Sequence, residues 1–141
     1  MERERLEGNA AFADGRFGDA RDAYRQMLAL WQEYKGSSRR SLSSGLIIAA
    51  AKCWSNLAIA DLKLHDHQGA QSDASAGGTL LEDPLLRMKL SAAEWASLAP
   101  IKRKLLFRKG LALNNGVGWC ETSRRNACRT SGNNFDRSTK S

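Results

Sequence analysis

Proline is scarce in this chain, which has two among 141 residues. A helix that contains no proline keeps its backbone hydrogen bonds, because every residue then has an N–H to donate. Long proline-free stretches rich in alanine and leucine therefore predict an all-α fold. At this length we expect a single domain with a continuous core.

Cysteine and histidine are almost as rare, with three and two residues. Cys53, Cys120 and Cys128 form no C-x-x-C pair and are odd in number, which argues against a disulfide framework and predicts reduced thiols. We expect Cys53 to behave as a small buried apolar residue. His65 and His67 have no cysteine or third ligand nearby, so no metal site or other cofactor is predicted.

The sequence also lacks a long apolar run. The longest candidate, 46–51, is far shorter than the about 20 residues of a membrane-spanning helix. The first nine residues carry both charge signs, with no apolar stretch after them as a secretory signal requires. These absences predict a cytoplasmic protein with no membrane partner.

Motifs of catalysis are missing too. The sequence has no glycine-rich phosphate loop, no nucleophile arrangement that includes histidine and no spacing typical of metal ligands. The prediction is that the protein is not an enzyme.

What the chain does contain is a repeated spacing of small residues. Gly8 is followed after twelve positions by Ala20 and four later by Tyr24, and Ala58 is followed at the same intervals by two alanines, at 70 and 74. Two antiparallel helices cross closely only where side chains are small, so we expect Gly8 to face Ala20. A fixed spacing that recurs along a chain is typical of a repeat architecture.

The residues around this spacing fit the tetratricopeptide pattern. Trp54 and Leu57 precede Ala58 in the expected register, and Gly15 and Gly18 bracket a predicted turn between two helices. The chain resembles tetratricopeptide repeat proteins over roughly residues 2–30, 51–80 and 102–113. The resemblance implies a solenoid of antiparallel helix pairs, about two and a half repeats long, within residues 1–113. Repeat one would occupy 1–34, repeat two 51–82 and the start of repeat three 102–113.

The matched starts of these repeats are widely spaced. Gly8 and Ala58 are 50 residues apart, and Gly110 follows 52 later, whereas a bare repeat occupies about 34 residues. Each connection therefore carries extra residues, as in immunophilin-type co-chaperones, which these extended linkers resemble. The first insertion, Gly36–Gly45, is rich in glycine and serine and predicts a mobile loop.

The second insertion predicts a further helix. Ser91 and Glu94 have the spacing of a capping box, in which each side chain bonds the other residue's backbone N–H. Trp95, Leu98 and Ile101 would continue an apolar stripe from there towards the third repeat. After residue 113 the pattern fails, and 114–141 is predicted to be a poorly ordered tail.

Positive charge is the other global property, with a formal net charge of +7. One dense basic cluster comprises Lys102, Arg103, Lys104, Arg108 and Lys109, which would attract an anion. Nucleic acid is a distant candidate, because no aromatic residues interleave with the basic ones and no nucleic-acid fold signature is present.

Five polar residues stand out on the predicted first helices of the repeats. Arg5 and Asn9 are four apart, as are Lys104 and Arg108, so each pair projects from one helical face, and Asn56 lies between the pairs in the stacking order. A repeat superhelix presents these helices along its concave side, which is where such proteins bind their partners.

The same five positions resemble the dicarboxylate clamp of tetratricopeptide co-chaperones. That clamp uses Lys and Asn in the first repeat, Asn in the second, and Lys and Arg in the third. Four of the five residue types agree, and Arg5 stands where the clamp has lysine. The resemblance implies binding of the acidic carboxyl-terminal tail of cytosolic heat-shock chaperones of the ninety- or seventy-kilodalton class.

Two other functions remain open at this point. The repeats could form a scaffold for another protein, with Asn9 and Asn56 bonded to the backbone of a neighbouring repeat and the basic residues merely solvated. Alternatively, the basic cluster could bind RNA or DNA electrostatically, in which case binding would depend steeply on salt.

Overall fold

The computed structural model describes residues 2–37 and 42–115. Within these ranges the chain is helical throughout, apart from short turns, and contains no strand, which confirms the all-α prediction. The helices are α1 (Glu2–Ala13), α2 (Phe17–Ser37), α3 (Ser44–Lys63), α4 (His67–Glu82), α5 (Pro84–Arg87) and α6 (Ala92–Ser97). A further helical stretch, called here the 99–115 helix, runs to the end of the described part.

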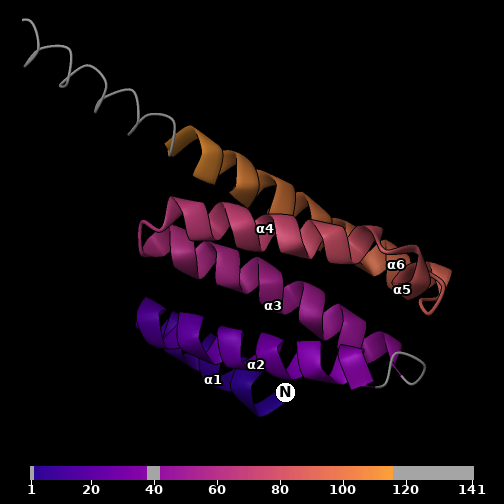
Figure 1. The fold of residues 1–141 in the computed structure, drawn as a ribbon. Coiled ribbons are helices and arrows are strands. Elements are labelled where there is room, and N and C mark those ends of the chain that lie inside the picture. The colour runs from indigo at the N-terminus through magenta and orange to yellow at the C-terminus, as the bar shows by residue number, and fades with distance from the viewer. Residues whose placement is uncertain (1, 38–41, 116–141) are drawn as a thin grey trace, which may run out of the picture.

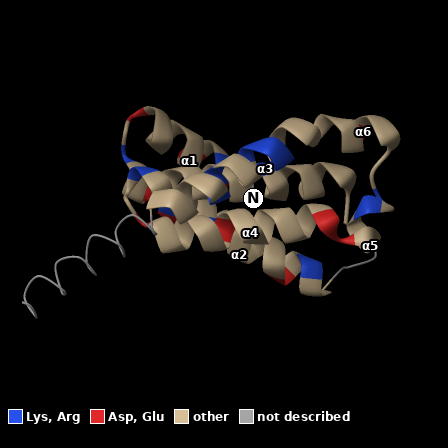
Figure 2. Ribbon diagram, turned by 90° about the horizontal axis from the view of Figure 1, so that it is seen from above, with Lys and Arg blue, Asp and Glu red and all other residues tan. Residues whose placement is uncertain are grey.

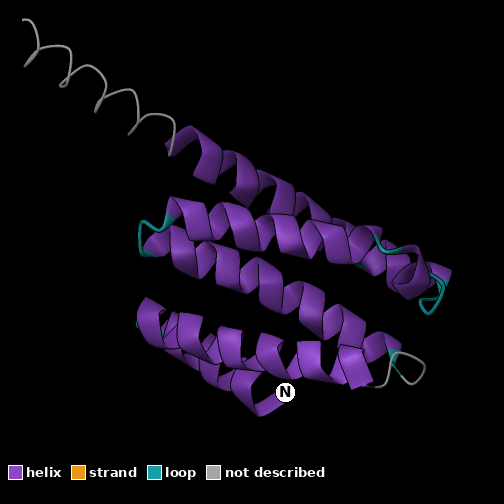
Figure 3. Ribbon diagram, in the orientation of Figure 1, coloured by secondary structure: helices purple, strands orange, loops and turns teal. Residues whose placement is uncertain are grey.

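Consecutive long helices run in opposite directions and stack in chain order, from α1 at one end to the 99–115 helix at the other (Figure 1). Figure 3, coloured by secondary structure, shows that the stack consists of helices joined by short turns. Seen from above, α1 and α3 lie along one side and α2 and α4 along the other (Figure 2). The first helix of each hairpin therefore lies in one layer and the second in the other.

The turn between α1 and α2 depends on Gly15, whose φ of +77° lies in the left-handed region. The hairpin closes around Ala20 and Tyr24, both essentially inaccessible to solvent. Gly8 lies against the Tyr24 ring, because a Cβ built on Gly8 would lie 2.5 Å from Tyr24 Cε1. Because Gly8 has no side chain, the Tyr24 ring fits between the two closely packed helices.

The turn between α3 and α4 is held by a capping carboxylate. Asp66 precedes the first turn of α4, and its Oδ1 accepts a hydrogen bond of 2.9 Å from the Gly69 N–H. His65 adopts a left-handed φ of +60° here, and both histidines lie at this turn as predicted. The described residues contain no group of three or more His, Cys, Asp or Glu side chains placed to hold a metal ion.

The core runs through the whole stack. Its largest fully buried apolar side chains are Trp31, Tyr24, Met27, Ile47 and Leu57. Cys53 is also fully buried, as predicted, and burial raises the pKa of its thiol to about 12. A thiol of that pKa stays protonated and unreactive at neutral pH.

The second insertion forms the helices that the sequence predicts. Ser91 and Glu94 make a capping box at the start of α6, and Glu94 also accepts a 2.6 Å hydrogen bond from Ser44 at the start of α3. Leu98 and Ile101 are buried, and Arg87 lies over the Trp95 ring at 4.9 Å. The insertion therefore packs onto the stack and leads directly into the 99–115 helix.

The first insertion is shorter than predicted. Gly36 and Ser37 belong to α2, and α3 already begins at Ser44, so four of the ten residues of the expected loop Gly36–Gly45 are helical. Residues 38–41 and the predicted tail from 116 onward lie outside the described part. Leu42, which precedes α3, and Ile47 in its first turns are both buried in the core, and this packing stabilises the start of α3.

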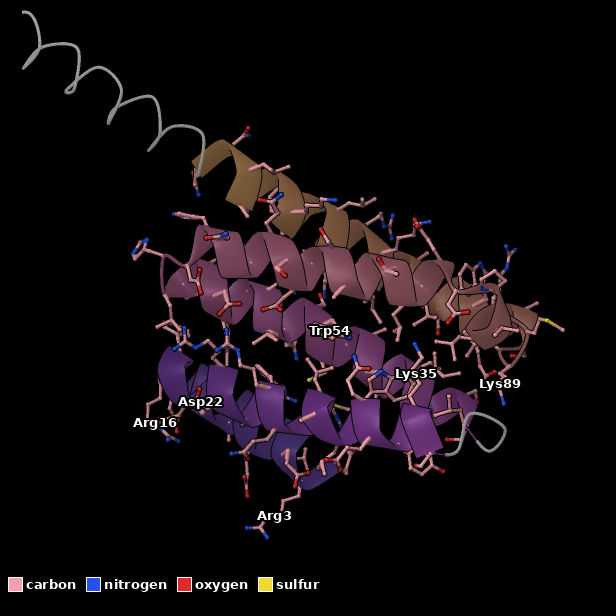
Figure 4. All side chains as sticks on the ribbon, in the orientation of Figure 1. Arg3, Arg16, Asp22, Lys35, Trp54 and Lys89 are labelled. Atoms are coloured by element: carbon pink, nitrogen blue, oxygen red, sulfur yellow. The ribbon has the colours of Figure 1, made fainter. Side chains whose placement is uncertain are left out.

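A groove lies between α2 and α4, the two helices that form the layer opposite α1 and α3. Trp54 of α3 lines it, and Lys35 Nζ and Asp83 Oδ2 approach to 3.9 Å at its edge (Figure 4). Its lining mixes tryptophan with charged and polar residues.

Among residues 2–37 and 42–115, one helix, α3, is long and apolar enough to cross a membrane when length and composition alone are considered. Half of its most apolar window is buried inside the fold, and core helices of proteins that never enter a membrane meet the same criteria.

Candidate functional site

Side chains from four helices meet in one polar cluster. Arg5 and Asn9 come from α1, Asn56 from α3 and Arg108 from the 99–115 helix, and Tyr24 of α2 lies beneath them. Four of the five residues that the sequence singles out therefore lie around one tyrosine.

Tyr24 is the centre of this cluster. Its ring is buried in the space that Gly8 leaves open, and its hydroxyl donates a 2.8 Å hydrogen bond to Asn9 Oδ1. Burial raises the pKa of Tyr24, and the nearby cations Arg5 and Arg108 partly offset that rise. Two guanidinium groups from opposite ends of the stack thus act on the same hydroxyl.

The two asparagines are bonded to each other across the layer of first helices. Asn56 Nδ2 donates to Asn9 Oδ1 at 3.2 Å, so this oxygen accepts from both Asn56 and Tyr24. An amide group carries two N–H donors besides its oxygen. With its oxygen used twice, Asn9 retains its own two donors for a ligand, whereas the Asn56 side chain also acts on Tyr24 and lowers the pKa of its hydroxyl.

Arg108 is anchored to α3. Its Nη1 donates to the Ser55 carbonyl oxygen and, at 2.5 Å, to the Ser55 hydroxyl. Burial lowers the pKa of Arg108, although an arginine keeps its charge at neutral pH. The hydrogen bonds to Ser55 use one terminal nitrogen, so the guanidinium retains further N–H groups on its fork.

Arg5 is held by a neighbour on its own helix. Its guanidinium donates to both carboxylate oxygens of Glu2, and this bonding raises the pKa of Arg5. The Arg5 side chain is 25% exposed. The Glu2 carboxylate shows how a carboxylate docks on this arginine through two oxygens at once.

Lys104 does not join the hydrogen-bonded cluster. It is exposed, one turn before Arg108 on the 99–115 helix, and makes no hydrogen bond or ion pair with another residue of the described part. Because residues four apart share a helical face, its ammonium can still reach a ligand that contacts Arg108.

The sequence-based prediction missed three participants, Tyr24, Ser55 and Glu2. Tyr24 was visible as part of the repeated spacing, but its bond to Asn9 depends on how α1 and α2 cross. Ser55 acts through its backbone carbonyl as well as its hydroxyl, and no residue pattern signals that. Glu2 is three residues before Arg5, a spacing at which opposite charges pair on a helix.

Taken together, the cluster is a set of cations and amide donors with few competing acceptors. Its charge-assisted donors suit an oxyanion, and a carboxylate is the anion that Arg5 already binds. Comparison of the chain with protein-family models, curated proteins and solved structures gives no match. The functional argument therefore stands on the geometry of the cluster.

Proposed function

We propose that the protein is an adaptor that binds the acidic carboxyl terminus of a partner protein, with the α1, α3 and 99–115 helices forming a tetratricopeptide-like groove. The partner class that the clamp resemblance implies is the cytosolic heat-shock chaperone. The protein then acts in the cytoplasm by binding rather than by catalysis.

The observation that carries this proposal is the double acceptor role of Asn9 Oδ1. Bonds from Tyr24 and Asn56 fix the Asn9 amide, so its N–H donors have a set direction before a ligand arrives. A preorganised donor loses little entropy on binding. Arg5 and Arg108, whose charges both act on Tyr24, add positive charge at the same place.

A terminal aspartate matches this arrangement chemically. It presents a side-chain carboxylate and a main-chain carboxylate close together, and both need charge-assisted donors. The asparagines supply donors without adding charge, which avoids further repulsion between Arg5, Lys104 and Arg108.

The proposal is tested by titrating the chain calorimetrically with a short acidic peptide that ends in aspartate. Asn9→Ala and Arg108→Lys each remove or alter one donor of the cluster and should weaken binding by about 1.5–3 kcal/mol, or roughly one to two decades. Lys102→Ala is the matched control: Lys102 is exposed on the 99–115 helix but lines a groove against α4.

Unchanged affinity in Asn9→Ala and Arg108→Lys, with both variants folded by circular dichroism, would assign peptide binding to another surface. A chain that binds RNA or DNA with steep salt dependence and ignores the peptide would point to the basic cluster instead.

A further inference from the structure

Lys52 of α3 is a cation on the side of the stack that carries the cluster. It lies one turn before Asn56, and residues four apart project from the same helical face. Its side chain is exposed. The relation of Lys52 to Asn56 on α3 is the same as that of Lys104 to Arg108 on the 99–115 helix.

Lys52 also contributes to the electrostatic environment of Glu2, the carboxylate that pairs with Arg5. The pKa of the Glu2 carboxyl is lowered, mainly by its hydrogen bond to Arg5, and the charge of Lys52 adds to this effect. The charges of a cation on α1, Arg5, and a cation on α3, Lys52, therefore both act on one carboxylate of α1. This surface therefore carries a further cation, Lys52, in addition to Arg5, Lys104 and Arg108.

The two carboxylates of a terminal aspartate are satisfied by the residues around Tyr24. Four residues along α3 correspond to about 6 Å, and an extended peptide rises about 3.3 Å per residue, so Lys52 is about two peptide residues away from Asn56. A peptide side chain about two residues before the terminal aspartate would therefore lie near Lys52 rather than near the cluster around Tyr24.

We propose that Lys52 is a specificity-determining residue of the groove, and that its ammonium pairs with an acidic side chain upstream of the terminal aspartate. The inference rests on the proposed peptide-binding function. It adds a selection that the five clamp residues do not make, namely a preference for a partner with a second acidic residue near its carboxyl terminus.

The test is a double-mutant cycle between the full chain and a set of peptides. Each peptide ends in aspartate and carries a single glutamate at the second, third or fourth position from the end, and a matched peptide has glutamine there. Affinities are measured for the natural chain, for Lys52→Ala and for Lys102→Ala, which removes the same charge from the side that faces α4.

For at least one position, exchanging glutamate for glutamine should weaken binding to the natural chain and to Lys102→Ala by about three- to fivefold, and should change binding to Lys52→Ala little. The difference should shrink when salt is raised, because both partners are exposed. Equal glutamate preference in Lys52→Ala and the natural chain would overturn the role of Lys52 while leaving peptide binding intact. Failure of every peptide to bind would refute the proposed function and this inference with it.

Discussion

At the scale of single residues, the polar cluster depends on a buried hydroxyl. Tyr24→Phe keeps the ring that fills the space at Gly8 and removes only the donor to Asn9 Oδ1. We expect a loss of about 1 kcal/mol in the free energy of unfolding, together with a weaker affinity for the acidic peptide, because Asn9 loses one of its two anchors. Denaturant titration and calorimetry measure the two effects.

Tyr34→Phe is the matched control, since it makes the same change ten residues along α2. It should leave the peptide affinity unchanged. If Tyr24→Phe binds the peptide as tightly as the natural chain does, the hydroxyl does not position Asn9.

A second residue-scale feature is the buried carboxyl of Asp61 on α3. Its side chain is fully inaccessible, neither of its oxygens accepts a hydrogen bond, and Arg25 Nη2 comes no closer than 3.9 Å. Burial, together with the neighbouring Asp73 of α4, raises the pKa of Asp61 to about 8. When Asp61 is protonated, its carboxyl O–H can donate a hydrogen bond to the carboxylate of Asp73.

This pKa shift makes the stability depend on pH. The ordinary pKa of the group is 3.8, so between about pH 4 and pH 8 the folded chain holds a proton that the unfolded chain has released. Stability is therefore highest below this window and falls as the pH rises through it. Asp61→Asn should raise the free energy of unfolding by about 2 kcal/mol at pH 8, with a gain that shrinks towards pH 4.

Denaturant unfolding between pH 4 and pH 8 measures this difference. Asp22→Asn, at an exposed carboxylate on α2 (labelled in Figure 4), is the control and should show no such trend. Parallel stability curves for Asp61→Asn and the natural chain would contradict a protonated Asp61.

At the scale of helices, the packing of the 99–115 helix depends on one glycine of α4. A Cβ on Gly77 would lie 2.8 Å from Leu105 Cδ2 and 2.9 Å from Trp54 Cβ, whereas a Cβ on Gly78 would meet nothing within 4 Å. Gly77→Ala should therefore destabilise the chain by about 1–3 kcal/mol, because Leu105 must shift. Gly78→Ala should be neutral or should stabilise it by about 0.5–1 kcal/mol, because alanine favours the helix.

Thermal unfolding of the two variants compares these neighbours directly. A stabilising effect of Gly77→Ala equal to that of Gly78→Ala would show that the 99–115 helix does not pack on α4 at this point.

Helices are also the scale at which sequence and structure can be compared. The apolar and small-residue periodicity predicts both hairpins, and the Ser91 capping box predicts the start of α6. The predicted loop 36–45 was too long by two residues at each end, because its glycine and serine content suggests a loop although α2 continues to Ser37 and α3 begins at Ser44. The spacing of Gly8 and Ala20 predicts a close crossing of two helices, but it does not show that the Tyr24 ring fills the space at Gly8.

The candidate site was predicted in part. Arg5, Asn9, Asn56 and Arg108 were singled out from their types and spacing, and the structure brings them together. Their bonds to Tyr24, Ser55 and Glu2 could not be read from the sequence, since each depends on the relative rotation of helices. Whether all five residues bind a peptide stays a prediction.

At the scale of the whole molecule, the site exists only when the stack is complete. Arg5 and Arg108 are 103 positions apart in the sequence, and both act on Tyr24 because the stack brings α1 and the 99–115 helix to the same tyrosine. The formal charge of +7 adds a long-range attraction for an acidic partner, which speeds encounter at low salt. Affinity for a carboxyl terminus should nevertheless come from the fixed donors of the cluster.

The most direct test of this account compares two peptides that differ in one group. Calorimetric titration of the natural chain with an Asp-terminated acidic peptide and with its carboxyl-amidated form isolates the terminal carboxylate. We expect micromolar affinity for the free acid and a loss of at least about tenfold on amidation, the minimum for one charge-assisted contact. Equal affinity for the two peptides would contradict a carboxylate clamp, whatever else the groove binds.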